Sequence, residues 1–474
     1  MTKRSALRAI GQMPVMSLAA MALAVPAMAQ NRAVEVVPGG QTGPQGVPQT
    51  NRWTENWSAQ PADDAPLLEK IRHIPIGDGG SYLSIGGEAR AYYTDWKHST
   101  LGLRAGDDND PVATRLRLLA DLHVGENLRA YVELGDNREF GEQFGTVNNR
   151  DKLDIYQAFV DVTLPLGKAG RITVRPGRFE MPLGNAKLVG MREGLNMRFT
   201  YQGVRATYIL PGKLTVDAFA LRPVAIKPDR MDDGPNHAVK FHGVYLSTPQ
   251  SLFGFGVDAY WYAVERDRAV LSFGTGRDVR NNWGGRLWKK GARWDVDLEG
   301  NVQTGSFIDR DIAAYAILFE GGYTVPTAPL KPRFGLKANL FSGDRNAADG
   351  KAGTFVSASP RLPLISEAAF FNLSNLMDLY PSVTVKPHKA VTVMVGPDFL
   401  WRHRRGDGVY IGPSGASFAP YASGRYIGTD LNLEAAWQVS KRLSLRLYET
   451  YFLAGDGFAQ RGGRDGNYLG VMST

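Results

Sequence analysis

Arginine alternates with leucine in the stretch TRLRLLADLH, residues 114–123. Side chains of an extended chain point alternately to opposite faces, so Arg115 and Arg117 share one face and Leu116 and Leu118 the other. A guanidinium group is planar and can bind a carboxylate through two parallel hydrogen bonds. A row of such groups along one face of a sheet could therefore bind and release anionic solutes.

The same alternation places further basic side chains on the polar face of predicted strands. This set comprises Arg90, Arg115, Arg117, Arg129, Arg175, Arg205, Lys337, Arg402 and Arg446. Acidic residues share that face, so we expect a mixed field with cationic stretches. Conduction needs several binding sites, each strong enough to attract a solute and weak enough to release it.

Alternating segments of about ten residues recur from Ser81 to the C-terminus, separated by Gly, Pro, Asn and Asp. The 18 predicted strands are 81–95, 113–124, 127–137, 153–164, 170–180, 200–210, 213–224, 238–248, 253–265, 280–289, 292–304, 312–325, 331–342, 376–387, 389–402, 425–439, 442–454 and 466–474. Short and long links tend to alternate along this series. No long segment shows helical periodicity.

Two unlike faces on so many strands predict an all-β fold, a transmembrane antiparallel β-barrel of 18 strands. The apolar face would meet lipid, where an arginine costs about 2–4 kcal/mol at the midplane, and the basic face a water-filled lumen. A soluble β-sandwich would also alternate and is the competing fold.

The N-terminus supports export from the cytoplasm. Residues 1–29 contain an early basic region, an apolar run and the small-residue site Ala27-Met28-Ala29, which predicts a secretory signal peptide cleaved near Ala29/Gln30. A membrane anchor is the alternative. Residues 30–78 are rich in Pro, Gly and Gln and predict a flexible periplasmic segment, and 79–474 would form the barrel, located in the outer membrane.

Composition and motifs favour a channel over an enzyme. The formal net charge of +8 does not indicate a nucleic-acid partner, and the sequence has no cysteine. No catalytic, cofactor or recognised metal-ligand motif is present, so we expect no enzyme activity, cofactor or metal. The loop GDDNDP gathers Asp107, Asp108 and Asp110, whose oxygens suit Ca²⁺, but the spacing is not that of an EF-hand loop and favours a solvated loop.

One long stretch carries a family resemblance. GRFEMPLGNAKLVGMREGLNMRFTYQGVR, residues 177–205, resembles the central signature of the alginate export family, outer-membrane barrels of Gram-negative bacteria. The matching residues are Gly177, Arg178, Gly184, Leu188, Arg192, Asn196, Gly203 and Arg205. Further pieces match in order downstream, including Ser342-Gly343-Asp344, Trp401-Arg402 and Gly455-Asp456.

The resemblance implies an 18-stranded barrel whose basic lumen passes an anionic uronate polysaccharide outward. It assigns basic lumen roles to Arg178, Arg192 and Arg205. The implied partners are an anionic polysaccharide or small anionic solutes, outer-membrane lipid, and periplasmic export or synthesis components. A general porin for uptake of small nutrients and a β-rich outer-membrane or secreted enzyme are the alternatives. We expect the long segment 343–375 to fold over or into the barrel mouth.

Overall fold

The computed structural model describes residues 43–77, 80–145, 149–250, 252–361, 364–412, 416–418 and 424–474. In these residues eighteen strands form one closed antiparallel barrel. In chain order the barrel strands are β2 (Ser81–Lys97), β3 (Val112–Val124), β4 (Leu128–Phe140), β5 (Asp151–Pro165), β6 (Arg171–Phe179), β7 (Tyr201–Leu210), β8 (Leu214–Ala225), β10 (Val239–Ser247), β11 (Gly256–Leu271), β12 (Gly274–Lys290), β13 (Trp294–Phe307), β14 (Arg310–Thr324), β15 (Arg333–Phe341), β17 (Leu376–His388), β18 (Val391–Arg402), β21 (Tyr426–Gln438), β22 (Ser444–Ala454) and β23 (Gly466–Ser473).

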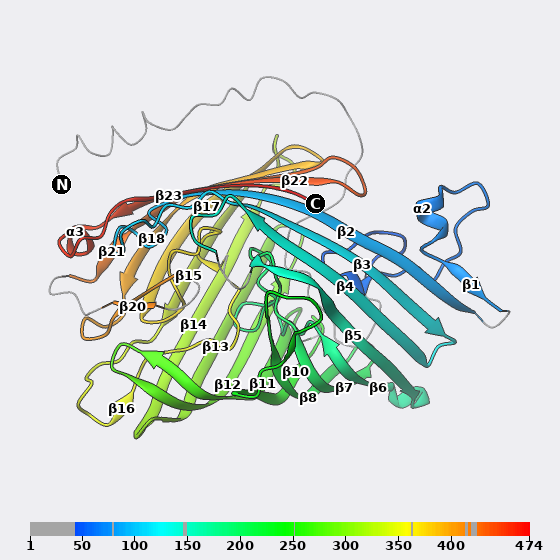
Figure 1. Cartoon of the computed structure of the whole chain (residues 1–474), viewed down its shortest axis with the longest axis horizontal. Helices are drawn as coiled ribbons and strands as arrows, with labels where there is room; N and C mark the ends of the chain where they lie inside the picture. Colours follow the sequence, from blue (N-terminus) through cyan, green and yellow to red (C-terminus); the bar gives the residue numbers. More distant parts are fainter. Residues whose placement is uncertain are drawn as a thin grey trace.

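The barrel closes between its last and first strands. β23 pairs antiparallel with β2, from Ala91 opposite Ser473 to Lys97 opposite Asn467, and Figure 1 shows the red and blue strands side by side. Closure removes the free sheet edges that would otherwise expose unpaired backbone groups. The chain therefore forms a complete wall of hydrogen-bonded strands.

Several short strands and helices accompany the 18 barrel strands. β1 (Ile74–Ile76) pairs with the start of β2, β9 (Gly234–Pro235) with the end of β8, and β16 (Lys351–Ala352) runs parallel to β14. β19 (Val409–Ile411) and β20 (Ala416–Phe418) form a separate pair. The short helices are η1 (Arg52–Thr54), α2 (Leu67–Lys70), η3 (Gly167–Ala169) and α3 (Asp456–Ala459). No helix in the described residues is long and apolar enough to cross a membrane.

The two faces of β3 differ as the sequence predicts. Leu116 and Leu118 are 55% and 58% exposed on the outer surface, whereas Arg115 is 0% and Arg117 5% exposed on the inner face. Leu119 also points inward and is buried among aromatic side chains. An apolar outer surface is what a barrel in lipid requires.

Connections divide the barrel into two ends. Links such as 125–127, 211–213 and 291–293 are brief and lie at what we call the short-turn end. Links such as 98–111, 180–200 and 342–375 lie at the other, the long-loop end. In outer-membrane barrels the short turns face the periplasm and the long loops the exterior.

The predicted strands all exist, with boundary differences of a few residues. The largest difference concerns β11 and β12, which extend beyond the predicted 253–265 and 280–289 and meet at a two-residue turn, Ser272 and Phe273. Residues 266–279 belong to no predicted strand, and in the structure both strands continue through this segment up to the turn.

Two of the long links fold into the barrel. Ser357 Oγ, from the link 342–375, donates to the Leu188 carbonyl of the link 180–200 at 2.7 Å. Phe355 is fully buried, and the Gln303 side chain of β13 donates to the Val356 carbonyl at 2.8 Å. The segment 343–375 thus packs against both the inner wall and the other inward loop.

Candidate channel interior

Six arginines line one side of the interior, from β2 to β7. Their exposed fractions lie between 0 and 6%. The set, which we call the arginine wall, is Arg90, Arg115, Arg117, Arg129, Arg175 and Arg205. Arg90 lies directly opposite Arg115 in the strand register, and Arg175 opposite Arg205. Cross-strand neighbours of like charge repel one another, so this wall requires carboxylates nearby.

Strand carboxylates pair with three arginines of the arginine wall. The pairs are Arg129 with Asp121 (2.7 and 2.9 Å), Arg175 with Asp161 (2.6 and 2.7 Å) and Arg205 with Asp217 (2.8 Å). In the same wall, Arg117 Nη1 lies 3.3 Å from Glu133 Oε1 and 3.7 Å from Glu180 Oε1. Breaking one partner of such a buried pair leaves the other charge uncompensated, which costs about 3–5 kcal/mol.

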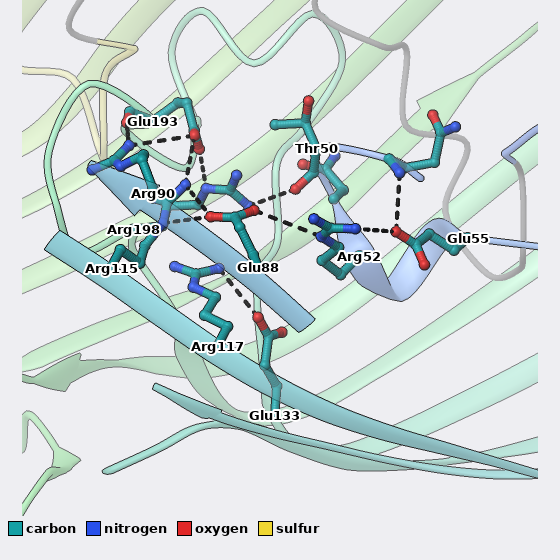
Figure 2. Close-up of polar contacts among 12 residues, drawn as sticks. Thr50, Arg52, Glu55, Glu88, Arg90, Arg115, Arg117, Glu133, Glu193 and Arg198 are labelled. Carbon is teal, nitrogen blue, oxygen red and sulfur yellow. Dashed lines mark hydrogen bonds and ion pairs between the residues drawn. The ribbon is translucent and has the colours of Figure 1, made fainter. Parts of the chain in front are cut away.

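A carboxylate from a loop binds two further arginines of the arginine wall, Arg90 and Arg115. Figure 2 shows Glu193, from the link 180–200, among three arginines. Its Oε1 lies 2.8 Å from Arg115 Nη2 and 3.5 Å from Arg90 Nη1, and Arg198 forms an ion pair with its other oxygen. Arg90 also donates to the Glu193 and Leu195 carbonyls at 2.9 Å each. We call Glu193 with these three arginines the Glu193 cluster.

The Glu193 carboxyl is held in its charged form. Burial opposes its ionisation, but the charges of Arg115, Arg198 and Arg90 outweigh burial and hold the pKa of Glu193 well below its ordinary value. The cluster is therefore a preformed site for a carboxylate, occupied by the protein's own side chain.

The described part of the N-terminal segment also enters the interior. Trp53 is fully buried, and its Nε1 donates to Glu180 at 3.2 Å. Arg129 donates to the Trp53 carbonyl at 2.8 Å, and Arg198 to the Thr50 carbonyl at 2.8 Å. Glu55 is 1% exposed and pairs with Arg52 at 2.9 Å.

This packing differs from the flexible segment that the composition of 30–78 predicts. Gly and Pro do favour mobility, but Trp53 supplies an apolar ring that contacts Arg175 of the arginine wall, and Glu55 pairs with Arg52 and Arg72. Residues 1–42, with the predicted signal peptide and cleavage site, lie outside the described residues.

The remaining predicted residues occupy different environments. Lys337 is half-buried on the inner face, with Nζ 4.8 Å from the Tyr380 ring. Arg446 reaches Tyr448 Oη at 3.4 Å on the same face. Arg402 ends β18 and donates to the Gly424 carbonyl at 2.7 Å.

Arg192 lies in the inward link 180–200. Its guanidinium lies 4.4 Å from the centre of the Phe199 ring. Arg192 adopts a left-handed backbone with φ of 57°. It thus borders the Glu193 cluster in sequence without belonging to it.

Arg178 departs from the predicted lumen set. It lies three residues from Arg175, an odd spacing that places the two on opposite faces of β6. Its strand partner Gln202 is exposed, and its guanidinium donates to the carbonyls of Ile155 (2.7 Å) and Asp233 (3.0 Å) at the long-loop end. The family motif alone suggested a lumen role, and strand geometry corrects it.

The expectation of a water-exposed arginine face is wrong for the arginine wall. Inward loops and the N-terminal segment cover these side chains, which are buried in ion pairs. A cavity of about 80 Å³, bordered by Tyr92, Glu139 and Glu367, has room for several water molecules. Alternation reports which face a residue lies on, but not what fills the space in front of it.

The loop aspartates proposed for calcium have other partners. Asp107 accepts hydrogen bonds from Thr100 N (3.0 Å), Thr100 Oγ1 (2.7 Å) and Gly102 N (3.1 Å), so it organises the loop 98–111. Asp108 accepts from His98 N at 2.9 Å, and Asp110 is exposed. Asp107 and Asp108 thus have hydrogen-bond partners within the loop, and their carboxylates and a His98 ring nitrogen lie within 4.8 Å of one another.

The sequence predicts acidic residues on the inner face but not which of them pair with the arginine wall. Glu193 and Arg198 lie in the quoted stretch 177–205 and were not singled out, although charged residues in a link predicted to be loop were a usable signal. Asp398 of β18 and Asp430 of β21 face each other in register and are fully buried. The alternation of 425–439 already places Asp430 on the polar face.

The closed 18-strand wall, the apolar outer surface and the charged interior define the class of an outer-membrane β-barrel channel. The sequence matches the profile described as Alginate export over residues 81–472, and the chain belongs to this family. Family and fold together indicate a channel protein of the outer membrane.

Solved structures share the fold. The chain is similar to OccK5 (OpdH) of Pseudomonas aeruginosa, with a TM-score of 0.54, 13% identity and coverage of 83% of this chain and 97% of that one. OprD of the same organism gives a TM-score of 0.51 at 13% identity, covering 83% and 94%. OccAB4 of Acinetobacter baumannii gives 0.52 at 9% identity, covering 83% and 97%. No curated protein is significantly similar in sequence.

Proposed function

We propose that this outer-membrane channel passes anionic solutes, including a uronate polysaccharide, along the arginine wall. The Glu193 cluster is the observation that supports this proposal most directly. Three guanidinium groups converge there on one loop carboxylate, and a uronate carboxylate has the same charge and geometry as that of Glu193. Passage is then an exchange in which solute carboxylates replace the loop carboxylate.

The order of the arginines suits stepwise transfer. Along β3, Arg115 lies nearer the long-loop end than Arg117, and Arg129 lies opposite His123, near the short-turn end. A charge pair at ~4 Å gains about 1 kcal/mol at the dielectric constant of water and about 4 kcal/mol at an effective value of ~20. Several such sites in series bind a polyanion without trapping it at one point.

The filled interior favours a second candidate, a porin for small anionic solutes. The segment 50–55 and the links 180–200 and 342–375 occupy space that a polymer needs. Under the first candidate these segments move aside, whereas small solutes need smaller rearrangements. In both cases we propose that residues 1–29 are removed on export, which the intact mass of the mature protein tests.

Current block in planar bilayers separates these candidates. Oligouronates of increasing length are added to the full mature chain, with neutral oligosaccharides of equal length as the comparison. Export of a polymer predicts block that grows with length and is specific to charge, whereas a small-solute porin responds only to the shortest oligomers. Equal block by charged and neutral sugars would contradict both.

A matched pair of variants tests the role of the Glu193 cluster. Glu193→Gln removes one carboxylate charge from the cluster, while Arg115 keeps Glu88 at 2.7 Å and Arg198 keeps Glu180 at 3.2 Å, so oligouronates should bind more tightly. Glu126→Gln makes the same change in an exposed short turn and should leave block unchanged. Identical block in both variants would show that solutes do not reach the cluster.

A further inference from the structure

Three aspartates converge at the long-loop end of β5. Asp151, Asp154 and Asp233 each offer a carboxylate oxygen, and these oxygens lie within 4.8 Å of one another. The register between β4 and β5 shifts between Gly135 and Asn137, and this irregularity buries both β5 aspartates although they are three residues apart.

This part of β5 has lost its neighbour in the barrel wall. The pairing of β5 with β6 ends at Ala158, so residues 151–157 extend beyond the β6 edge. The link 226–238 lies there instead. Met231 N donates to the Leu153 carbonyl at 3.2 Å, and Asp154 Oδ2 accepts from the backbone N–H of both Asp232 (2.8 Å) and Asp233 (3.1 Å).

Asp151 is the unexplained member of the group. It is 2% exposed, and no described residue donates a hydrogen bond to its carboxylate, whose Oδ1 is wholly enclosed. An ionised carboxyl buried without a partner is strongly unfavourable. One of its oxygens lies within 4.8 Å of an oxygen of Asp154 and of an oxygen of Asp233, so a single cation placed among them can contact all three residues.

The nearby positive charge does not balance these acids. Arg178 Nη1 lies 3.6 Å from Asp154 Oδ1 but also donates to the Ile155 carbonyl, and Nη2 donates to the Asp233 carbonyl. Asp232 adds a fourth carboxyl, with a buried and unpartnered Oδ1.

We propose that Asp151, Asp154 and Asp233 bind a divalent cation, Ca²⁺, at the long-loop end of β5. Calcium takes six to eight oxygen ligands in flexible geometry, so three carboxylates with water or carbonyl oxygens suffice. The ion would fasten the link 226–238 to β5 where β6 is missing. This role is separate from solute passage.

Calcium binding to the full mature chain, refolded in detergent free of lipopolysaccharide, tests the proposal. Equilibrium dialysis with ⁴⁵Ca²⁺ should show a single site with a dissociation constant of about 1 mM or tighter, the range of extracellular calcium modules. Asp151→Asn and Asp233→Asn should each weaken binding at least tenfold. Calcium should also slow amide exchange in 226–238 of the wild type but not of these two variants.

Asp229→Asn is the matched control, because Asp229 lies in the same link, is exposed and pairs only with Lys152 at 2.8 Å. It should bind calcium as the wild type does. Heat-modifiable migration confirms that each variant has folded; if Asp151→Asn does not fold, Asp233→Asn decides. Absence of binding to the wild type at about 10 mM, well above that range, or wild-type binding by the folded aspartate variants, would overturn the proposal.

Discussion

Replacing Trp53 with alanine should release the N-terminal segment from the barrel interior. Trp53 is fully buried, its Nε1 donates to Glu180, and its ring lies 5.0 Å from the Arg175 guanidinium. Truncation of a buried tryptophan to alanine costs about 3–5 kcal/mol. At about 1.4 kcal/mol per factor of ten, the ratio of docked to undocked segment should fall by roughly two to four orders of magnitude.

Single-channel conductance and amide exchange report this release. Trp53→Ala should raise the mean conductance and accelerate exchange in residues 43–58. Trp294→Ala is the matched control, because Trp294 is 64% exposed at the short-turn end and should change neither quantity. A folded Trp53→Ala variant with wild-type conductance and exchange would show that the segment does not obstruct the channel.

Two further substitutions and one pH dependence test the barrel strands and the loops that join them. Leu118→Arg places a charge on the lipid face and should destabilise the folded barrel by about 2–4 kcal/mol, measured by urea unfolding in lipid vesicles; unchanged stability would contradict lipid contact. Gly177→Ala should cost about 1–3 kcal/mol, because φ is 133° and a Cβ would lie 2.3 Å from the Ala158 carbonyl, whereas Gly300→Ala meets no atom within 4 Å and should be tolerated. Burial lowers the pKa of His403 to about 4, so the stability it supplies should be present above about pH 6.5 and lost as the pH falls towards 4. Its neutral Nδ1 accepts from Gly343 N at 3.1 Å, so the protection of the Gly343 amide from exchange, corrected for the intrinsic pH dependence of exchange, should fall over this range in the wild type. A pH-independent protection factor would refute the assignment.

The barrel could be predicted because its signal is local. A strand between lipid and a polar interior must alternate with period two, and each of the eighteen strands shows this in its own ten or so residues. The ends of β11 and β12 were not predicted, because the residues 266–279 do not alternate strictly between apolar and polar.

The interior could be predicted only in part. Alternation identified Arg90 and Arg115 as inward-facing, but their partner Glu193 lies 103 residues from Arg90 in a link without periodicity. The pairing depends on how that link folds back into the barrel, which no local pattern encodes. Arg178 shows the converse: a motif match assigned it to the lumen, and its odd spacing from Arg175 placed it on the other face.

The reversal potential of the wild-type channel in a KCl gradient tests the central proposal most directly. If solutes pass along the arginine wall, the channel should prefer anions, and the preference should strengthen at low salt, where the Debye length reaches about 30 Å at ~0.01 M. Glu193→Gln should shift the potential further towards anion selectivity. A cation-selective wild type, or a selectivity that Glu193→Gln leaves unchanged, would contradict passage along this wall.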